Sequence, residues 1–216
     1  MGKQSREKRE RRELGERRPE PLVRVRSGPG TPAWRDLIAD AIHDGVCRAF
    51  GKEEAPLMCW AYAVSGAIAL NVLAKREIYT YTAGTLGVRT GIEDWCFTLD
   101  PNDPQYAGVE YHAWIVSKPQ DDQLGVSIAA PPDVEVIDLS ARHYAAHAAH
   151  AGVPFSRPDI GRCVWSRFGD LPPLSSPQGL YFSSNMEATL GIQHMWPRHE
   201  AAVNSIIRGA LAQAGR

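Results

Sequence analysis

An uncharged segment of 18 residues, 57–74, constrains the fold more than any other feature of this sequence. Apolar residues cover nearly every side of the helix that it would form, and such a helix is buried on several sides. The length is at the lower bound for a membrane span, but Ser65, Gly66 and Asn71 interrupt the segment and no second segment supports a membrane topology. We therefore expect a helix over 56–75 inside a protein core, and no membrane span.

The elements around this helix change in character along the chain. Apolar residues recur at helical spacing over 31–50, beginning at Thr31-Pro32 and ending before Gly51. Stretches typical of strands follow over 77–82, 85–90, 95–99, 109–117 and 134–139. The remainder predicts an Ala-rich helix over 141–151, a loop-rich stretch over 152–180 and an amphipathic helix over 199–214. Helices followed by a series of antiparallel strands indicate an α+β fold, here with a C-terminal helix.

The net charge of −1 combines two regions of opposite sign. Residues 1–26 contain ten Lys or Arg and five Glu, whereas the remainder contains 14 basic and 20 acidic residues. Because 1–30 lacks apolar periodicity, we expect a disordered basic arm there and a single α+β domain over 31–216. The arm either keeps the chain in solution or contacts RNA, the ribosome or another acidic surface. The acidic body lacks the basic face of a nucleic-acid-binding domain.

The cysteines indicate a reducing environment. Cys47, Cys59, Cys96 and Cys163 are too widely spaced for a zinc ribbon. The first residues lack the apolar core and cleavage site of a secretory signal. We therefore expect a cytoplasmic protein with free thiols.

Cys59 is the candidate nucleophile. It lies three residues after Pro56, at the start of the buried helix, where unpaired N–H groups and the helix dipole favour a thiolate. A thiolate is the nucleophile that acyl transfer needs. Free cysteine is also a common core residue, so the assignment depends on a base beside it.

His112 and Asp138 lie on two later predicted strands. If those strands are neighbours, their alternation lets the two side chains meet. An imidazole oriented by a carboxylate is a base that can activate a thiol. The order along the chain is a Cys at a helix start, a His on a strand and an Asp on a following strand, and this order predicts a Cys-His-Asp triad.

Short motifs at these positions resemble a known superfamily. The sequence Cys-Trp-Ala-Tyr beginning at Cys59 resembles the Cys-Trp-Ala-Phe start of the papain central helix. The sequence His-Ala-Trp beginning at His112, followed by an Asp-bearing strand, is similar to the compact transglutaminase-like branch of that superfamily. The resemblance covers about residues 55–140 and implies that the Cys-bearing helix packs on an antiparallel sheet. It also implies that Cys59 is the nucleophile, His112 the general base and Asp138 the orienting carboxylate.

Two features depart from the papain-like pattern. Papain-like enzymes have a Gln oxyanion donor six residues before the nucleophile, where this chain has Glu53, which cannot donate when ionised. The backbone N–H of Cys59 supplies one oxyanion donor, and the second is left open. The interval of 26 residues between His112 and Asp138 implies an insertion over 118–132.

These observations predict a cysteine-dependent acyl-transfer enzyme, namely a peptidase, amidase, deamidase or transferase. Its substrate would be a peptide, an amide or a thioester, and Trp60 and Trp114 would wall the acyl pocket. The alternative is a non-catalytic relative that acts as a binding module, with the basic arm contacting an acidic partner.

Three histidines form a second candidate group. His143, His147 and His150 share one face of the predicted helix over 141–151. No Asp, Glu or Cys shares that face at a clear spacing, which favours a solvated face over a metal site. We therefore expect no metal and no cofactor. His143 is also an alternative to His112 as the catalytic base.

Overall fold

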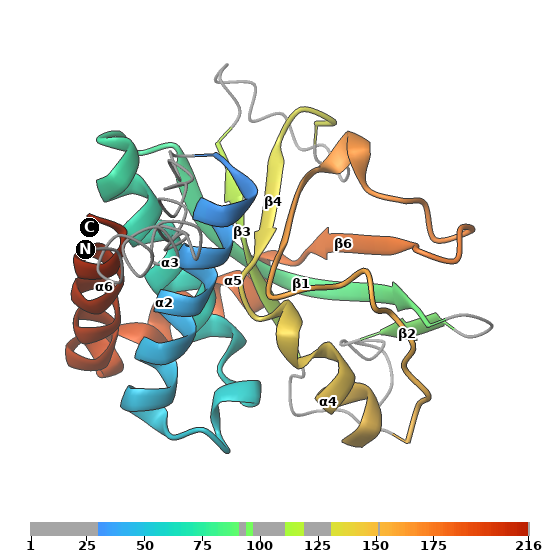
Figure 1. Cartoon of the computed structure of the whole chain (residues 1–216), viewed down its shortest axis with the longest axis horizontal. Helices are drawn as coiled ribbons and strands as arrows, with labels where there is room; N and C mark the ends of the chain where they lie inside the picture. Colours follow the sequence, from blue (N-terminus) through green and yellow to red (C-terminus); the bar gives the residue numbers. More distant parts are fainter. Residues whose placement is uncertain (1–29, 91–93, 97–110, 119–130, 151, 216) are drawn as a thin grey trace, which may run out of the picture.

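The computed structural model describes residues 30–90, 94–96, 111–118, 131–150 and 152–215, without the side chains of 94–96 and His150 (Figure 1). The predicted basic arm, 1–30, lies outside these residues except for Gly30, and so does most of the predicted insertion over 118–132. The described part is an α+β structure that ends in a long helix.

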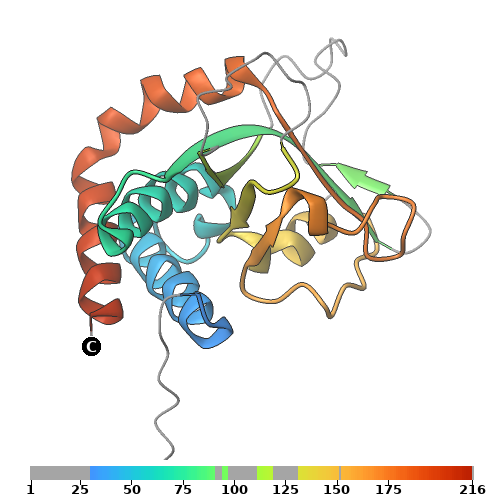
Figure 2. The same cartoon turned by 90° about the horizontal axis from the view of Figure 1, so that it is seen from above.

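Six antiparallel strands form one sheet in the order β2-β1-β3-β4-β5, and β6 also pairs with β1. The strands are β1 (Tyr79–Arg89), β2 (Asp94–Cys96), β3 (His112–Ser117), β4 (Glu135–Asp138), β5 (Val164–Arg167) and β6 (Leu180–Ser184). The long, curved β1 pairs with β3 through its first half and with β6 through its second half (Figure 2). Gly84 pairs with both strands, and a Cβ there would lie 2.0 Å from the Ser183 carbonyl oxygen.

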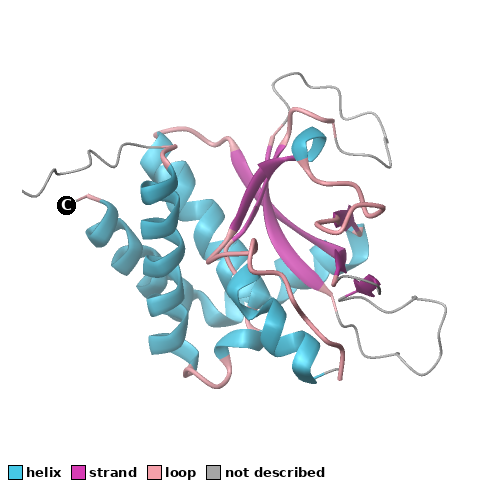
Figure 3. Cartoon of the chain, turned by 45° about the vertical axis from the view of Figure 1, so that its right-hand side comes forward, coloured by secondary structure: helices cyan, strands magenta, loops and turns pink. Residues whose placement is uncertain are grey.

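The larger helices pack on one face of this sheet (Figure 3). They are α2 (Pro32–Phe50), α3 (Cys59–Ala74), α5 (Met186–Met195) and α6 (Glu200–Ala214). α3 contacts β1 and β3, and α2 and α6 pack against α3 and each other. The short α4 (Tyr144–His150) contributes instead to a second apolar cluster with Trp114, Val136 and Phe182. Alternation along β3 explains the division, because Ala113 and Ile115 belong to the first cluster and Trp114 to the second.

The uncharged segment is a buried helix, as predicted. Residues 60–67 of α3 are all buried, and among the described residues no helix is long and apolar enough to span a membrane. α3 lies very close to the sheet at Gly66, where an added Cβ would come within 2.5 Å of Leu139 Cδ1 and 2.7 Å of Ile115 Cδ1. The helix begins at Cys59 rather than at Pro56, because a separate 3₁₀ turn, η1 (Ala55–Leu57), precedes it.

One expectation about elements was wrong, and several short elements were not predicted. The strands predicted over 77–82 and 85–90 are one strand, β1, because Gly84 is a close-packing position and not a turn. The stretch over 152–180 is mostly loop, as predicted, but it also contains β5, a strand of only four residues among prolines. The strand β6 and the helix α5 were not predicted, although the Asn185 side chain caps α5 by accepting a hydrogen bond from Ala188 N–H.

Candidate active site

Cys59 is the first residue of α3. The Met58 carbonyl accepts the first helical hydrogen bonds, from the N–H groups of Ala61 and Tyr62 at 2.8 and 3.2 Å. The N–H groups of Cys59 and Trp60 therefore remain without an acceptor among the described residues, as the first amides of a helix do. The thiol of Cys59 is half-buried and contacts the Tyr111 carbonyl oxygen at 3.7 Å.

His112 is the first residue of β3 and is 3% exposed. Its Nε2 lies 2.5 Å from Asp138 Oδ2, and Asp138 is the last residue of β4. The two strands pair antiparallel, so the expectation that they are neighbours is confirmed. The structure thus brings together the His and the Asp that the sequence singled out.

Asp138 is buried at 1% exposure, yet each of its oxygens accepts two hydrogen bonds. Oδ2 accepts from His112 Nε2 and from the Tyr144 hydroxyl, each at 2.5 Å. Oδ1 accepts from the N–H and the hydroxyl of Ser140 at 2.8 and 2.7 Å. Burial raises the pKa of Asp138, but these partners outweigh burial and lower it, so Asp138 is ionised.

The charge of His112 follows from its neighbours. Burial lowers the pKa of His112, but the Asp138 carboxylate and a hydrogen bond with the Cys59 side chain outweigh it and raise this pKa to about 10. Because Nε2 contacts Asp138, Nδ1 is the ring nitrogen left for Cys59. The site therefore supports an imidazolium between the Cys59 sulfur and the Asp138 carboxylate.

Tyr144 and Ser140 are site residues that the sequence did not reveal. The Asp138 side chain accepts a hydrogen bond from the N–H of Ser140, two residues later, and so closes a turn of a kind that Asp side chains often form. Tyr144 follows a 3₁₀ turn, η3 (Ala141–His143), and this turn sets the direction of its side chain toward β4. Burial and then the charge of Asp138 raise the pKa of Tyr144 well above its usual value, so the hydroxyl stays protonated and donates.

The two tryptophans predicted to wall an acyl pocket lie in different surroundings. The Trp114 ring is fully buried and stacks with His112, with ring centroids 6.4 Å apart. Trp60 is buried against Phe50 and His199, with centroid distances of 5.6 and 5.2 Å. Of the two tryptophans, only Trp114 thus has a ring contact with a residue of the predicted triad, and the substrate-binding role of both stays a prediction.

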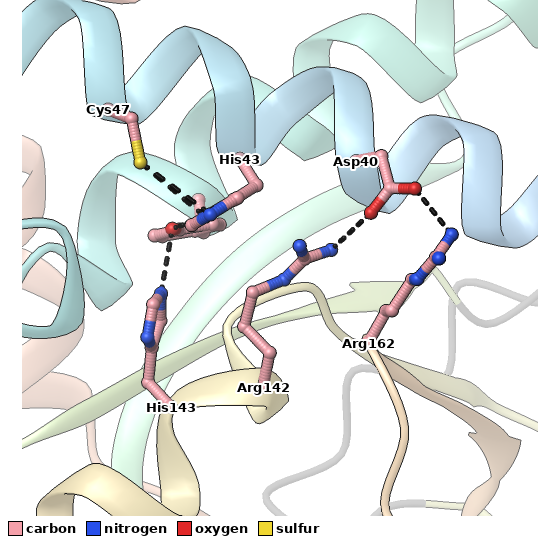
Figure 4. A network of polar contacts seen from close by, with 7 residues as sticks. Asp40, His43, Cys47, Arg142, His143 and Arg162 are labelled. Atoms are coloured by element: carbon pink, nitrogen blue, oxygen red, sulfur yellow. Dashed lines mark hydrogen bonds and ion pairs between the residues drawn. The ribbon is translucent and has the colours of Figure 1, made fainter. Parts of the chain in front are cut away.

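A second polar network joins α2, α3 and the turn before α4 (Figure 4). The Tyr62 hydroxyl is 2.6 Å from His43 Nδ1 and 2.9 Å from His143 Nε2, and Cys47 Sγ is 3.6 Å from His43 Nε2. Burial and nearby positive charge lower the pKa of His143 to about 4, so this imidazole is neutral. Its recorded partner is Tyr62 rather than Cys59, which makes it a poor alternative to His112.

The remaining histidines and cysteines of the described residues form no metal-binding group. His147 Nε2 donates to the Pro56 carbonyl at 2.8 Å and so ties α4 to the turn before Cys59. Burial raises the pKa of Cys163 to about 11, which makes it an unreactive thiol. Glu53 is exposed, in keeping with its not serving as an oxyanion donor.

Comparisons with known proteins bear on the fold alone. No family model matches the chain, and no curated protein matches it. Its fold is similar to that of a solved structure described as the crystal structure of genomics APC5867, with a TM-score of 0.56 and 13% sequence identity. The match covers 84% of this chain and 78% of the other.

Proposed function

We propose that this protein is a cysteine-dependent acyl-transfer enzyme in which Cys59, His112 and Asp138 form the catalytic triad. The observation that carries the proposal is the buried contact of 2.5 Å between His112 and Asp138, with the Cys59 side chain on the same imidazole. Such a chain of thiol, base and carboxylate is the arrangement that nucleophilic catalysis by cysteine requires. A papain-like or transglutaminase-like fold is part of the proposal, supported by the helix-strand-strand order of the triad.

The chemistry follows from the positions of these groups. The thiol proton is held on His112 Nδ1, so that His112 is an imidazolium, and the sulfur of Cys59 attacks a carbonyl carbon as the thiolate to form a carbon–sulfur bond while the carbonyl oxygen becomes an oxyanion. The imidazolium then returns its proton to the leaving amine, alcohol or thiol as that bond breaks, which leaves a thioester on Cys59. Water or an amine, deprotonated by His112, attacks the thioester and releases the thiolate. The product is an acid in hydrolysis and an amide in transfer.

The start of α3 offers a site for the oxyanion of the tetrahedral intermediate. The N–H groups of Cys59 and Trp60 have no acceptor among the residues described, and they belong to the end of the helix that favours negative charge. We assign the oxyanion to these two amides, which makes a side-chain donor in the place of Glu53 unnecessary. Removing one such donor costs about 10²–10³ in rate in a known protease.

The experiment is alkylation by iodoacetamide at pH 7, mapped by peptide mass spectrometry. We expect Cys59 to react at least about tenfold faster than Cys163, whose raised pKa makes it the internal control. Labelling at Cys59 should persist when Cys47, Cys96 and Cys163 are replaced, and should fall in His112→Ala. Equal labelling of all four cysteines in the folded protein would reject the triad and favour a non-catalytic binding module.

A further inference from the structure

A cavity of about 530 Å³ lies between the start of α4 and the loop over 155–162. Its volume is in the range of small-molecule sites, which is about 300–1,000 Å³. Apolar atoms of Phe155, Pro158 and Ile160 contribute to its wall, together with three arginines, Arg142, Arg157 and Arg162. Cys59, His112 and Asp138 are not among its lining residues, so it is separate from the proposed catalytic centre.

One arginine of this cavity is structural. Arg157 has a side chain that is only 4% exposed and forms two hydrogen bonds of 2.8 Å with the Asp159 carboxylate. Its Nη1 donates to the carbonyl groups of Arg89 and Gly179, and its Nη2 also donates to the Gln178 carbonyl. The pair Arg157–Asp159 is therefore neutral, and it holds one wall of the cavity against the ends of β1 and β6.

The other two arginines share a single carboxylate. Arg142 Nη2 lies 3.0 Å from Asp40 Oδ1, and Arg162 Nη1 lies 2.5 Å from Asp40 Oδ2 (Figure 4). Because two guanidinium groups share one carboxylate, one positive charge remains in excess beside the cavity. Each guanidinium has five N–H groups, and only one nitrogen atom of each contacts the Asp40 carboxylate. Arg142 Nε is buried without an acceptor in the described part of the chain, so this arginine has donors that Asp40 does not use.

We propose that this cavity binds a small organic anion, which places a carboxylate or a phosphate group on Arg142 and Arg162 and an apolar body on Phe155, Pro158 and Ile160. Guanidinium groups bind both kinds of anion through paired hydrogen bonds. The apolar wall gives the rest of the ligand its favourable burial. Asp40 competes with the ligand for the same two arginines and sets its affinity.

The test is calorimetric titration of the full chain with three probes of similar size: phenyl phosphate, benzoate and the neutral benzyl alcohol. We expect an anion to bind at least about tenfold more tightly than benzyl alcohol, in keeping with the strength of charge-assisted hydrogen bonds. Binding of phenyl phosphate but not of benzoate would identify a phosphate ester as the ligand class. Binding of benzoate but not of phenyl phosphate would identify a carboxylate.

Two variants separate this site from general attraction of anions. Arg162→Ala should weaken binding about tenfold, and Asp40→Asn should strengthen it several-fold, because one removes a donor and the other removes the competitor. Arg162 is 56% exposed, so its replacement leaves the core intact, and Arg167→Ala, an exposed change in β5 outside the cavity, is the matched control. Equal binding of benzyl alcohol, no binding of either anion, or equal effects of Arg162→Ala and Arg167→Ala would overturn the proposal. Cys59→Ala should leave the affinity unchanged, so the result is independent of the catalytic proposal.

Discussion

At the scale of single residues, the molecule is organised around the carboxylate of Asp138. An ionised carboxylate in a core is costly unless its oxygens are hydrogen-bonded, and here each oxygen has two donors. His112 donates to one of these oxygens, and the hydrogen bonds from Tyr144 and Ser140 fix the rotation of the carboxylate. We infer that Tyr144 is a positioning residue, since it acts on His112 only through Asp138.

Tyr144→Phe tests this role. Losing the hydroxyl donor should raise the pKa of Asp138, and the stabilisation that Asp138 gives is present above its unfolded pKa and lost as pH falls through its folded pKa. The midpoint of acid unfolding should therefore move to higher pH. Alkylation of Cys59 at pH 7 should slow about fivefold because His112 is less well oriented, which corresponds to an increase of about 1 kcal/mol in activation free energy.

Tyr79→Phe is the matched control for this change. It removes a similar hydroxyl bond, of 3.0 Å, to the Glu135 carboxylate on β4, away from the triad. Its effect on unfolding can resemble that of Tyr144→Phe, but alkylation of Cys59 should stay at the wild-type rate. If the two variants alkylate at the same rate, Tyr144 is structural only.

The residues of the site differ in how far the sequence determines them. Cys59 is predictable because a proline and an uncharged helix mark its position, and His112 and Asp138 because they stand on recognisable strands. Tyr144 was not predicted, because its direction depends on a change from a 3₁₀ turn to α4 within an Ala-rich stretch. Helical periodicity carries no sign of that change.

At the scale of elements, the packing of α3 on the sheet positions Cys59, the proposed nucleophile. At Gly66 the helix lies so close to Ile115 of β3 and to Leu139, the residue after β4, that a side chain has no space there. β3 carries His112 at its start, and β4 carries Asp138 at its end. The distance between α3 and these strands therefore sets the distance between the thiol and the imidazole.

Gly66→Val should destabilise the protein by about 1–3 kcal/mol, the usual cost of overpacking a core. The matched control is Gly191→Val in α5, where an added Cβ meets no atom within 4 Å. The control should leave the free energy of unfolding unchanged or slightly higher, because valine is the better helix former. Urea unfolding of both variants is the measurement, and equal midpoints would contradict the close seat of α3.

The elements that the sequence missed share a physical cause. β5 has four residues and lies among prolines and glycines, so its propensity is too weak to detect without its partner β4. Gly84 lies in the gap between the strands predicted over 77–82 and 85–90, whereas in the structure it allows β3 and β6 to pair with β1 at one residue. Both cases depend on tertiary pairing, which sequence periodicity does not contain.

At the scale of the whole molecule, sequence reasoning anticipated that the strands bearing His112 and Asp138, two residues of the proposed triad, would be neighbours. Helix, first strand and second strand meet because β3 and β4 are neighbours and α3 packs on β3. The sequence did not reveal the return of the chain after β5, in which β6 joins β1 and α6 packs against α2 and α3. This return completes the core around α3 without contributing a residue to the triad.

The central claim is that Cys59 accepts an acyl group with His112 as its base. The most direct measurement is incubation with p-nitrophenyl acetate, with the acetylated residue located by mass spectrometry and its formation timed in wild type, His112→Ala and His143→Ala. We predict a single acetyl group on Cys59, formed at least about 10²-fold more slowly in His112→Ala and at the wild-type rate in His143→Ala. Acetylation spread over several cysteines, or an equal loss of rate in both histidine variants, would contradict the claim.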